Sequence, residues 1–343
     1  MNSIIGEAYI VHQGIFLGDE KAINRVYPEA VRASLAKICA LTETVYTKAA
    51  VLDAPERFAD TAYIFSTWGM PAFTEREIET CFPKLRAVFY AAGTVQAFAR
   101  PFLARGVQVF SAWAANAVPV AEYTAAQIVL ANKGFYQNQR LYGRGEPARA
   151  AAHFQSHAGN YRVKTGLIGA GMIGSMVAER LRSVETEVLV FDPFLSDARA
   201  EQLHVRRVSL ETVFSECTVV SNHLANNAQT KDMLGYALFS KLPPYATFLN
   251  TGRGAQVVEQ DLARFLRERP DCTAVLDVTV EEPLPPAHPL CALDNCLLTT
   301  HIAGSAGQEV WRMAAYMLGE LQRLEAGTPT RYGVTTAMLE TMA

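Results

Sequence analysis

The chain has 343 residues, half of them apolar, which is enough for two domains of about 150 residues each. Its net charge of −3 and isoelectric point of about 6.2, with no basic run, exclude a surface built for nucleic acid. No stretch reaches the roughly 18 uncharged apolar residues of a membrane helix, and Glu7 interrupts an amino terminus without the basic start of a signal peptide. We therefore expect a soluble, cytoplasmic protein.

The pattern of cysteines also favours a cytoplasmic protein. The six cysteines are scattered, mostly beside apolar runs, and no two of them form a CxxC pair. This pattern favours buried thiols in a reducing compartment over disulfides or zinc ligands, and we predict no metal site.

In the first third of the chain, short apolar runs alternate with helical patterns. The predicted strands are residues 8–11, 44–46, 62–65, 87–90 and 107–110, and the predicted helices are residues 30–41, 75–82 and 96–104. Thr74 and Glu77 have the spacing of a capping box at the start of the second helix. Alternating strands and helices indicate parallel pairing, so a small α/β domain is predicted here.

A long helical pattern follows, with Pro119 in its first turn, and runs to about Tyr142 without a breaker. A helix of this length between two α/β halves is predicted to cross from one domain to the other. Residues 143–161 lack strong periodicity and are predicted to form an exposed arm. His153 and His157 could share a helical face there as metal ligands, but no acid or cysteine stands nearby, which favours a solvated arm.

Residues 164–193 read as strand, glycine turn, helix and strand. Gly169 would allow the tight turn, Gly171 would let the backbone approach a pyrophosphate, and Gly174 would let the helix pack on the strand. The phosphates would bind the free N–H groups of the helix amino terminus. Asp192 closes the second strand, 18 residues after Gly174 (192 − 174), where a carboxylate binds the ribose hydroxyls of NAD and repels the 2′-phosphate of NADP. The stretch therefore predicts NAD as the cofactor.

The α/β pattern continues beyond Asp192. Strands are predicted at residues 205–208, 218–221, 246–250, 273–278 and 296–299, and helices at residues 234–241 and 257–267. An amphipathic helix at residues 308–324 is predicted to return to the first domain. The predicted fold is thus α/β, with two doubly wound, parallel-sheet, Rossmann-like domains joined by a long crossing helix. The substrate domain would be discontinuous, residues 1–117 and 306–343, and the NAD-binding domain would be residues 118–305.

Polar residues of the kinds that a redox site needs follow three predicted strands of the second domain. Arg253 follows the strand that ends at Asn250, Asp277 and Glu282 follow the next, and His301 follows the last. Because ligands of open parallel sheets bind outside the carboxyl ends of the strands, these residues should share one edge with the cofactor. Arg253 would bind a substrate carboxylate, His301 would exchange a proton with the C2 oxygen, and Glu282 would orient the imidazole. This set suggests reversible reduction of a 2-oxo acid.

Each residue taken singly also has a structural interpretation. Arg253 could form a surface ion pair, Glu282 could lie in a solvated turn, and His301 could cap a helix or be satisfied in the core. Their common position at one sheet edge, beside a dinucleotide motif, is what favours the catalytic interpretation.

These motifs resemble the D-isomer-specific 2-hydroxyacid dehydrogenase family. The resemblance covers about residues 65–313 and is densest in GLIGAGMIG, LNTGRG, LDVTVEEPL with HPL, and TTHIAG. The intervals of 29 residues from Arg253 to Glu282 and 19 from Glu282 to His301 are similar to those of family members with short loops. The resemblance implies that Arg253, Glu282 and His301 are catalytic, that Asp277 lies near the nicotinamide carboxamide, and that the protein is a homodimer.

The resemblance also implies which residues contact the ligands. The expected cofactor-binding residues are Gly169, Gly171, Met172, Ile173, Gly174, Asp192, His223, Thr251, Gly252, Arg253, Asp277, His301 and Gly304. The expected substrate-binding residues are Trp68, Gly69, Met70, Gly93, Thr94, Arg253 and His301. A strand-end His223 in a purely structural hydrogen bond is the alternative to its contact with the nicotinamide ribose.

Three departures from the family pattern leave the substrate unassigned. Thr300 and Ala225 stand where proline is usual, and Thr94 with Val95 replaces the common Val-Asp after the glycine. Three hypotheses remain: an NAD-dependent 2-oxo-acid reductase acting on the CH–OH group of its product, an enzyme with another hydride donor such as phosphite, and an NAD(H)-responsive binding protein like the family's corepressors. Formate is disfavoured because formate enzymes resembling this family carry glutamine at the position of Glu282.

Overall fold

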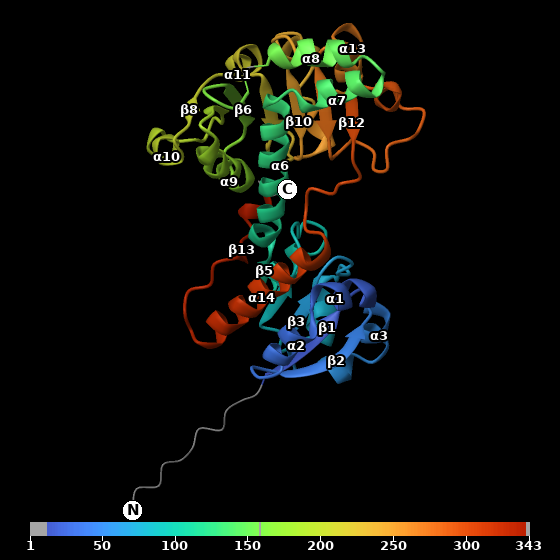
Figure 1. The fold of residues 1–343 in the computed structure, drawn as a ribbon. Helices are drawn as coiled ribbons and strands as arrows, with labels where there is room; N and C mark the ends of the chain where they lie inside the picture. Colours follow the sequence, from blue (N-terminus) through green and yellow to red (C-terminus); the bar gives the residue numbers. More distant parts are fainter. Residues whose placement is uncertain (1–11, 158, 341–343) are drawn as a thin grey trace, which may run out of the picture. The chain divides into compact units, whose positions relative to one another are not determined.

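A computed structural model describes residues 12–157 and 159–340 (Figure 1). The chain divides into two compact units. Of the described residues, 12–116 and 306–340 form one unit, and 117–157 with 159–305 form the other. Each unit has a sheet and hydrophobic cores of its own, so each is described separately.

The first unit is built on a mostly parallel sheet with the strand order β13-β5-β4-β3-β1-β2. Its strands are β1 Gln13–Leu17, β2 Ala40–Tyr46, β3 Thr61–Ser66, β4 Ala87–Tyr90, β5 Gln108–Ser111 and β13 Gly333–Val334. The two central strands β3 and β4 are buried at every residue, which is typical of a parallel sheet covered on both faces. Among the described strands of this unit only β13 pairs antiparallel, with β5 at the edge, and this strand was not predicted from the sequence.

Helices cover both faces of this sheet. They are α1 Glu20–Val26, α2 Glu29–Leu35, α3 Lys48–Asp53, α4 Glu75–Cys81, α5 Ala99–Ala104 and α14 Val310–Glu325. One face packs on α3, α4 and α5 through a core that includes Phe58, Phe82 and Phe102, and the other on α1, α2 and α14. The predicted return of the carboxyl-terminal helix to the first sheet is therefore confirmed, and so is the capping box of Thr74 and Glu77.

The second unit contains an entirely parallel sheet with the strand order β12-β11-β10-β9-β6-β7-β8. Its strands are β6 Lys164–Ile168, β7 Glu187–Phe191, β8 Arg206–Arg207, β9 Val219–Asn222, β10 Thr247–Asn250, β11 Thr273–Leu276 and β12 Cys296–Leu298. From β6 the chain winds outward first through β7 and β8, then through β9 to β12 on the other side. Ligands of such sheets bind at this reversal, outside the carboxyl ends of β6 and β9.

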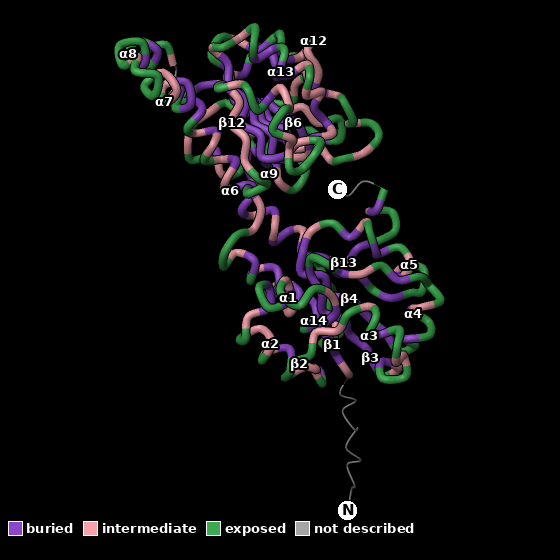
Figure 2. Tube along the Cα trace, turned by 90° about the vertical axis from the view of Figure 1, so that its right-hand side faces the viewer, coloured by how far each residue is buried: buried purple, intermediate pink, exposed green. Residues whose placement is uncertain are grey.

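The helices of the second unit enclose its sheet between two cores. They are α7 Phe135–Gly143, α8 Pro147–Gln155, α9 Met172–Leu181, α10 Asp197–Leu203, α11 Leu210–Glu216, α12 Tyr236–Phe239 and α13 Glu259–Glu268, preceded by the crossing helix α6 Trp113–Asn132. In Figure 2 the labelled strand β6 lies among buried segments, the edge strand β12 is half-buried, and exposed residues gather on loops and outer helix faces. The predicted fold class of two Rossmann-like domains, one of them discontinuous, is confirmed.

The predicted helix with Pro119 in its first turn is wrong at its start and in being uninterrupted, whereas its predicted end near Tyr142 is close to the end of α7 at Gly143. α6 begins earlier, at Trp113, and accommodates Pro119 in its interior, because the alanine-rich stretch before the proline continues the helix. α6 ends before Gly134, whose φ of 68° is left-handed, as is usual for a glycine after a helix. α7 then starts as a separate helix.

The prediction for residues 143–161 is right about exposure, since most of these residues are exposed, but it missed helix α8. Pro147 occupies the first turn of α8, a position that suits its fixed φ, and alanines follow. The buried side of α8 is small, Ala150 and His153, which explains the weak periodicity. His153 and His157 stack on each other and on Tyr245, and a Cβ at Gly134 would overlap the His157 ring. They belong to the packed unit and not to a solvated arm.

Several elements differ from their predicted positions. The strand predicted at residues 8–11 lies outside the described residues, and the first described strand, β1, begins at Gln13. The predicted helix at 30–41 is α2, which ends at Leu35, and β2 starts within the predicted helix, at Ala40. Helices α1, α3, α10 and α11 were not predicted, because each is only six or seven residues long. In the described part of the chain, no helix combines the length and apolarity needed to cross a membrane.

Candidate active site

The turn after β6 has the features of a dinucleotide-binding turn. Gly169 has a φ of 96°, and a Cβ on it would lie 2.8 Å from the carbonyl oxygen of His223. A Cβ on Gly174 would overlap the Gly169 carbonyl, so helix α9 packs directly on the turn. At Gly171, in contrast, a Cβ would meet no atom within 4 Å. The backbone of Gly171 is thus open to a ligand, at the start of a helix whose first N–H groups have no side-chain cap.

Asp192 follows β7, next to this turn. One carboxylate oxygen accepts a hydrogen bond from the Ala170 amide (2.7 Å) and the other from the Phe194 amide (2.8 Å). Each oxygen retains a second lone pair, so the carboxylate can still accept from ribose hydroxyls. Glycine turn, open helix terminus and carboxylate together fit the pyrophosphate and adenosine ribose of NAD.

His223 lies across the turn, after β9. Its amide donates to the Ile168 carbonyl (2.7 Å), and its Nε2 is 3.0 Å from the Ser221 hydroxyl. Its Nδ1 is enclosed and has no hydrogen-bond partner among the described residues. Burial lowers the pKa of His223 to about 4, so the ring is neutral at pH 7.

A buried amide network holds the loop that carries Arg253. The Asn222 side chain donates to Asn250 (3.0 Å) and to Gln256 (2.5 Å), and Gln256 donates to the carbonyls of Leu224 and Ala225. Asn250 in turn accepts from the Gly252 amide (3.1 Å) and donates to the Arg253 carbonyl (3.1 Å). The network joins the ends of β9 and β10 to the Arg253 loop and fixes the backbone from which the guanidinium projects.

Thr251 and Arg253, which are expected to bind ligands, and Ala225, which stands where proline is usual, lie beside this network. Thr251 is buried, and its hydroxyl lies 3.1 Å from that of Thr124 on α6. Arg253 is half-buried, and its guanidinium donates to the Gly252 carbonyl (2.7 Å); its other donors have no partner among the described residues and can bind a ligand. The Ala225 carbonyl accepts from both Gln256 (3.0 Å) and Thr230 (2.6 Å), so this loop is held firmly without the usual proline.

The structure brings His301 and Glu282 into direct contact. His301 Nδ1 lies 2.9 Å from Glu282 Oε2, and both side chains are partly exposed. The other carboxylate oxygen of Glu282 accepts from the Thr279 amide (3.3 Å). A carboxylate against Nδ1 favours the tautomer with the proton on that nitrogen, which leaves Nε2 for a substrate. His301 is exposed and has a left-handed φ of 59°, a conformation uncommon for residues other than glycine.

Asp277 anchors the loop that carries His301. Its side chain is buried, one oxygen accepts from the Thr299 hydroxyl (2.6 Å) and the Ile302 amide (2.7 Å), and the other accepts from the Ala303 amide (2.9 Å). The His301 amide donates to the Asp277 carbonyl (3.0 Å). The sequence analysis assigned Asp277 only to the nicotinamide carboxamide; its contacts here show that it also positions the His301 loop.

Gly254 joins the arginine loop to the glutamate turn. A Cβ on Gly254 would overlap the backbone of Thr279 and Val280, so the two segments touch at their main chains. Since β10, β11 and β12 are parallel neighbours, the loops that carry Arg253, Glu282 and His301 leave the sheet at the same edge. Gly304 lies in the last of these loops and is half-buried. Met172 and Ile173, in the first turn of α9, are exposed and half-buried.

The residues expected to bind substrate in the first unit lie at the carboxyl edge of its own sheet. Gly69 has a φ of 87° and contacts Asp19, which follows β1, so the loops after β1 and β3 meet where this sheet reverses direction. Trp68 is 39% exposed, and the Arg25 guanidinium lies 5.9 Å from its ring centre. The Met70 side chain is instead buried in the core, which leaves only its backbone for a ligand.

The loop after β4, in the same unit, offers backbone donors. The Ser111 hydroxyl donates to the carbonyls of Ala92 and Gly93 and holds the loop in place. Within the described residues, the amides of Gly69, Gly93 and Thr94 donate no hydrogen bond. Free adjacent N–H groups of this kind suit a carboxylate.

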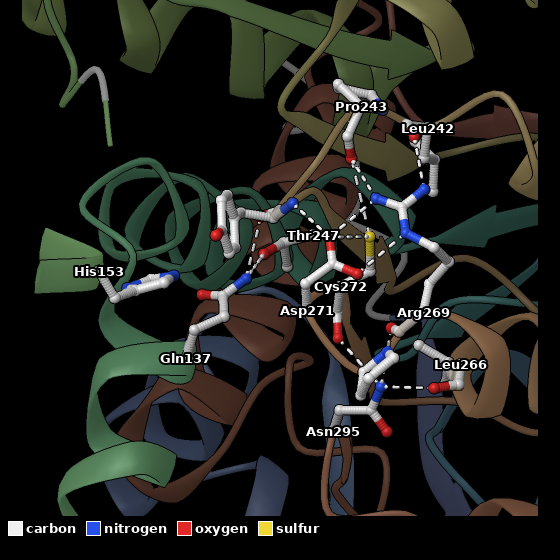
Figure 3. A network of polar contacts seen from close by, with 12 residues as sticks. Gln137, His153, Leu242, Pro243, Thr247, Leu266, Arg269, Asp271, Cys272 and Asn295 are labelled. Carbon is white, nitrogen blue, oxygen red and sulfur yellow. Dashed lines mark hydrogen bonds and ion pairs between the residues drawn. The ribbon is translucent and has the colours of Figure 1, made fainter. Parts of the chain in front are cut away.

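The opposite edge of the second sheet carries a polar network of a different kind (Figure 3). Arg269 binds Asp271 through two hydrogen bonds (2.9 and 2.8 Å) and the carbonyls of Leu242 and Pro243. Asn295 donates to the carbonyls of Leu266 and Cys272, and Gln137 reaches Thr247. Apart from Gln137 Oε1, which is buried without a hydrogen-bond partner among the described residues, these side chains are bonded to protein partners, which favours a structural role for this edge. No group of three metal-ligating side chains occurs among the described residues.

Histidine burial predicts how stability depends on pH. Burial lowers the pKa of His157 to about 4, with a contribution from His153, whose own pKa is also lowered by burial. Histidines of the unfolded chain bind protons below about pH 6.5, whereas His153 and His157 in the folded protein stay neutral to lower pH. Between the two pKa values the unfolded state therefore binds more protons than the folded state. The free energy of unfolding should therefore fall as pH drops from 7 to 5, by about 1 kcal/mol for half-buried His157 alone.

Urea unfolding at the two pH values measures this effect. We expect the variant with His153→Gln and His157→Gln to lose less stability between pH 7 and pH 5 than the wild type. An equal loss in both proteins would show that the histidine pair contributes nothing to the pH dependence.

Comparison with known proteins identifies the family. The fold and the turn after β6 define a dinucleotide-binding α/β protein. The family model described as "D-isomer specific 2-hydroxyacid dehydrogenase, NAD binding domain" matches residues 126–303. The chain belongs to the D-isomer-specific 2-hydroxyacid dehydrogenase family of NAD-dependent oxidoreductases, and the expected cofactor, NAD, is confirmed at this level.

Individual relatives are similar over different lengths. The chain is 31% identical to a D-3-phosphoglycerate dehydrogenase of Archaeoglobus fulgidus over 69% of its own length but only 44% of that protein's. It is 30% identical to an (S)-sulfolactate dehydrogenase of Chromohalobacter salexigens over 73% of its length and 80% of that protein's. The apo D-mandelate dehydrogenase of Rhodotorula graminis has the same fold, with a TM-score of 0.80 at 19% identity over 95% and 98% of the two chains.

Proposed function

We propose that this protein is an NAD-dependent D-2-hydroxyacid dehydrogenase that acts as a 2-oxo-acid reductase. The observation that carries the proposal is the contact of His301 Nδ1 with Glu282 Oε2 (2.9 Å), at the edge where Arg253 also leaves the sheet. The same sheet carries the glycine turn and Asp192. An acid–base pair, a carboxylate-binding arginine and a dinucleotide site are what reversible hydride transfer to a 2-oxo acid requires.

Each residue has one chemical task in this reaction. Bound NADH supplies the hydride that reduces C2 of the oxo acid, and NAD⁺ accepts it in the reverse direction. Arg253 binds the substrate carboxylate with its planar fork of donors and polarises the C2 oxygen. His301 donates the Nε2 proton to that oxygen, and Glu282 stabilises the imidazolium and holds its orientation.

The first unit has groups of its own that suit a substrate of this kind. The amides of Gly69, Gly93 and Thr94, which donate no hydrogen bond within the described residues, suit a carboxylate, and Trp68 is exposed and can contact a substrate side chain. Arg25 beside Trp68 favours an anionic or aromatic side chain over an aliphatic one.

We also propose that the protein acts as a homodimer through α6, α7 and α8. This surface exposes large apolar side chains, namely Leu130, Phe135, Tyr142 and Phe154. It also has a hollow of about 340 Å³ lined by Phe135, Asn138, Gln139, Tyr142 and Gly143. Burial of such a patch by a second copy would remove it from water. Sedimentation of Phe135→Glu with Tyr142→Glu should give a monomer where the wild type gives a dimer.

The test of the proposed activity is NADH oxidation against a panel of 2-oxo acids. The panel comprises glyoxylate, pyruvate, hydroxypyruvate, and branched-chain, aromatic and dicarboxylic oxo acids, with NADPH in parallel and phosphite with NAD⁺ as a separate arm. We expect turnover with NADH on oxo acids that carry aromatic or anionic side chains. Tight NADH binding without turnover on any acid would contradict the reductase and favour an NAD(H)-responsive binding protein.

Asp192 should determine the choice between NADH and NADPH. In Asp192→Ala the repulsion of a 2′-phosphate is lost, so we expect the ratio of kcat/KM for NADH over NADPH to fall at least about tenfold. Asp197→Ala is the control, because Asp197 is an exposed carboxylate in the same connection, paired with Arg207. An unchanged ratio in Asp192→Ala would remove this carboxylate from the ribose site.

A further inference from the structure

A carboxylate without an assigned role lies beside the proposed catalytic residues. Glu259 is the first residue of α13, six positions after Arg253 (259 − 253), and its side chain is only 11% exposed. The helix dipole favours a negative charge at this position. No side chain caps the amino terminus of α13. The two carboxylate oxygens of Glu259, however, contact residues outside α13.

Glu259 joins two turns that follow β11. Oε1 accepts a hydrogen bond from the Val280 amide (2.8 Å), and Oε2 lies 3.4 Å from Nε2 of His288, whose side chain is 16% exposed. His288 Nδ1 accepts from the Leu290 amide (3.3 Å), so in the neutral ring Nε2 carries the proton and faces Glu259. Leu290 itself is fully buried in the core of this unit. The carboxylate is therefore held from both sides.

The Val280 amide belongs to the turn that presents Glu282. In this turn the Thr279 amide donates to Glu282 Oε1 (3.3 Å), while Glu282 Oε2 binds His301 (2.9 Å). The turn rests on the main chain of Gly254, where a Cβ would overlap it. Gly254 blocks movement of the turn toward the arginine loop by steric contact, and Glu259 restrains it through a charge-assisted hydrogen bond.

We propose that Glu259, oriented by His288, is a positioning residue that sets the Glu282 carboxylate against His301. This inference rests on the proposed reductase function, because it assigns Glu259 a part in the same acid–base pair. Loss of the Val280 contact would let the turn shift, and a displacement of about 1 Å at such a site can cost about a hundredfold in rate. The neutral amide of glutamine could still accept from Val280 but would lose the negative charge that faces His288.

Steady-state kinetics with three variants test the proposal. Glu259→Ala should lower kcat for the best 2-oxo acid about tenfold or more with an unchanged dissociation constant for NADH, and Glu259→Gln should recover part of the loss. Asp261→Ala is the matched control. Asp261 lies in the same first turn of α13 but binds the Tyr236 amide (2.9 Å), away from the Glu282 turn. Equal losses in Glu259→Ala and Asp261→Ala would reduce Glu259 to a helix-stabilising charge and overturn the proposal.

A double variant shows whether Glu259 acts through Glu282. If it does, Glu259→Ala should cost about tenfold in the wild-type background and little in the Glu282→Gln background, since the carboxylate it positions is gone. The same factor in both backgrounds would mean that the two residues act independently, and the proposal would be wrong.

Hydrogen exchange gives a readout that does not depend on activity. In Glu259→Ala, peptides containing residues 279–282 should exchange faster, whereas Asp261→Ala should leave them unchanged. Unchanged exchange in Glu259→Ala would overturn the positioning role even in an active enzyme. Faster exchange in a protein without turnover on any oxo acid would support the contact while the reductase function fails.

Discussion

Replacement of His301 with alanine is expected to lower kcat for 2-oxo-acid reduction by about 10²–10⁴, the usual contribution of a positioned general acid. Its Nδ1 is engaged by Glu282 (2.9 Å), so the other ring nitrogen is the one that can protonate the substrate oxygen. The dissociation constant for NADH, measured by fluorescence titration, should stay within about twofold, because no cofactor phosphate or ribose contact is assigned to this side chain.

Two further variants make this result interpretable. His301 has a φ of 59°, where alanine is strained, so His301→Asn is the better tolerated substitution and should show the same loss of kcat. His204→Asn is the control, since His204 is exposed and also has a left-handed φ, 55°. Loss of NADH binding in His301→Asn, or a kcat near that of the wild type, would contradict the assigned role.

Local sequence signals were sufficient for the dinucleotide turn. Strand β6, the glycines, α9 and β7 lie within residues 164–191 and contact each other directly, so the pattern of apolar residues and glycines determines them. The break between α6 and α7 has a local signal as well, Gly134. It was overlooked because the neighbouring residues favour a helix, and because the His157 ring that fills the space beside this glycine comes from a distant segment.

In the candidate site, too, some residues could be identified from the sequence and others could not. Three strand ends placed Arg253, Glu282 and His301 at one edge, because the register of a parallel sheet aligns those ends. The supporting contacts carry no sequence signal: Glu259 meets His288, the first residue of the HPL motif, only in the folded chain, and Asn222 meets Gln256 in the same way. Asparagine at the end of two adjacent strands, β9 and β10, was the one available signal of the amide network.

Asp277 shows why a residue's position does not settle its role. From sequence it could be placed only after β11, beside the expected cofactor. Its contacts with Thr299, Ile302 and Ala303 depend on how the chain returns from β12, which no spacing rule specifies. The structure therefore adds a positioning role for the His301 loop to the one implied by family resemblance.

Arg253→Ala should impair both binding and chemistry. Its guanidinium makes a hydrogen bond only to the neighbouring Gly252 carbonyl (2.7 Å) within the described residues, so most of its donors are available to a substrate carboxylate and C2 oxygen. Loss of these charge-assisted bonds should raise KM and lower kcat together, with kcat/KM reduced by about 10²–10³. The loop itself should persist, because the amide network of Asn222, Asn250 and Gln256 holds the backbone and not the side chain.

Arg253→Lys separates charge from geometry. Lysine keeps the positive charge but lacks the planar fork that engages a carboxylate through two bonds, so it should recover only a small part of kcat/KM. Arg264→Ala is the control, since Arg264 is an exposed cation on α13 paired with Glu268 (2.9 Å). A KM unchanged in Arg253→Ala would show that Arg253 does not anchor the carboxylate, and that role would pass to the backbone amides of Gly69, Gly93 and Thr94 alone. Full activity in Arg253→Lys would mean that only the charge at this edge of the sheet matters.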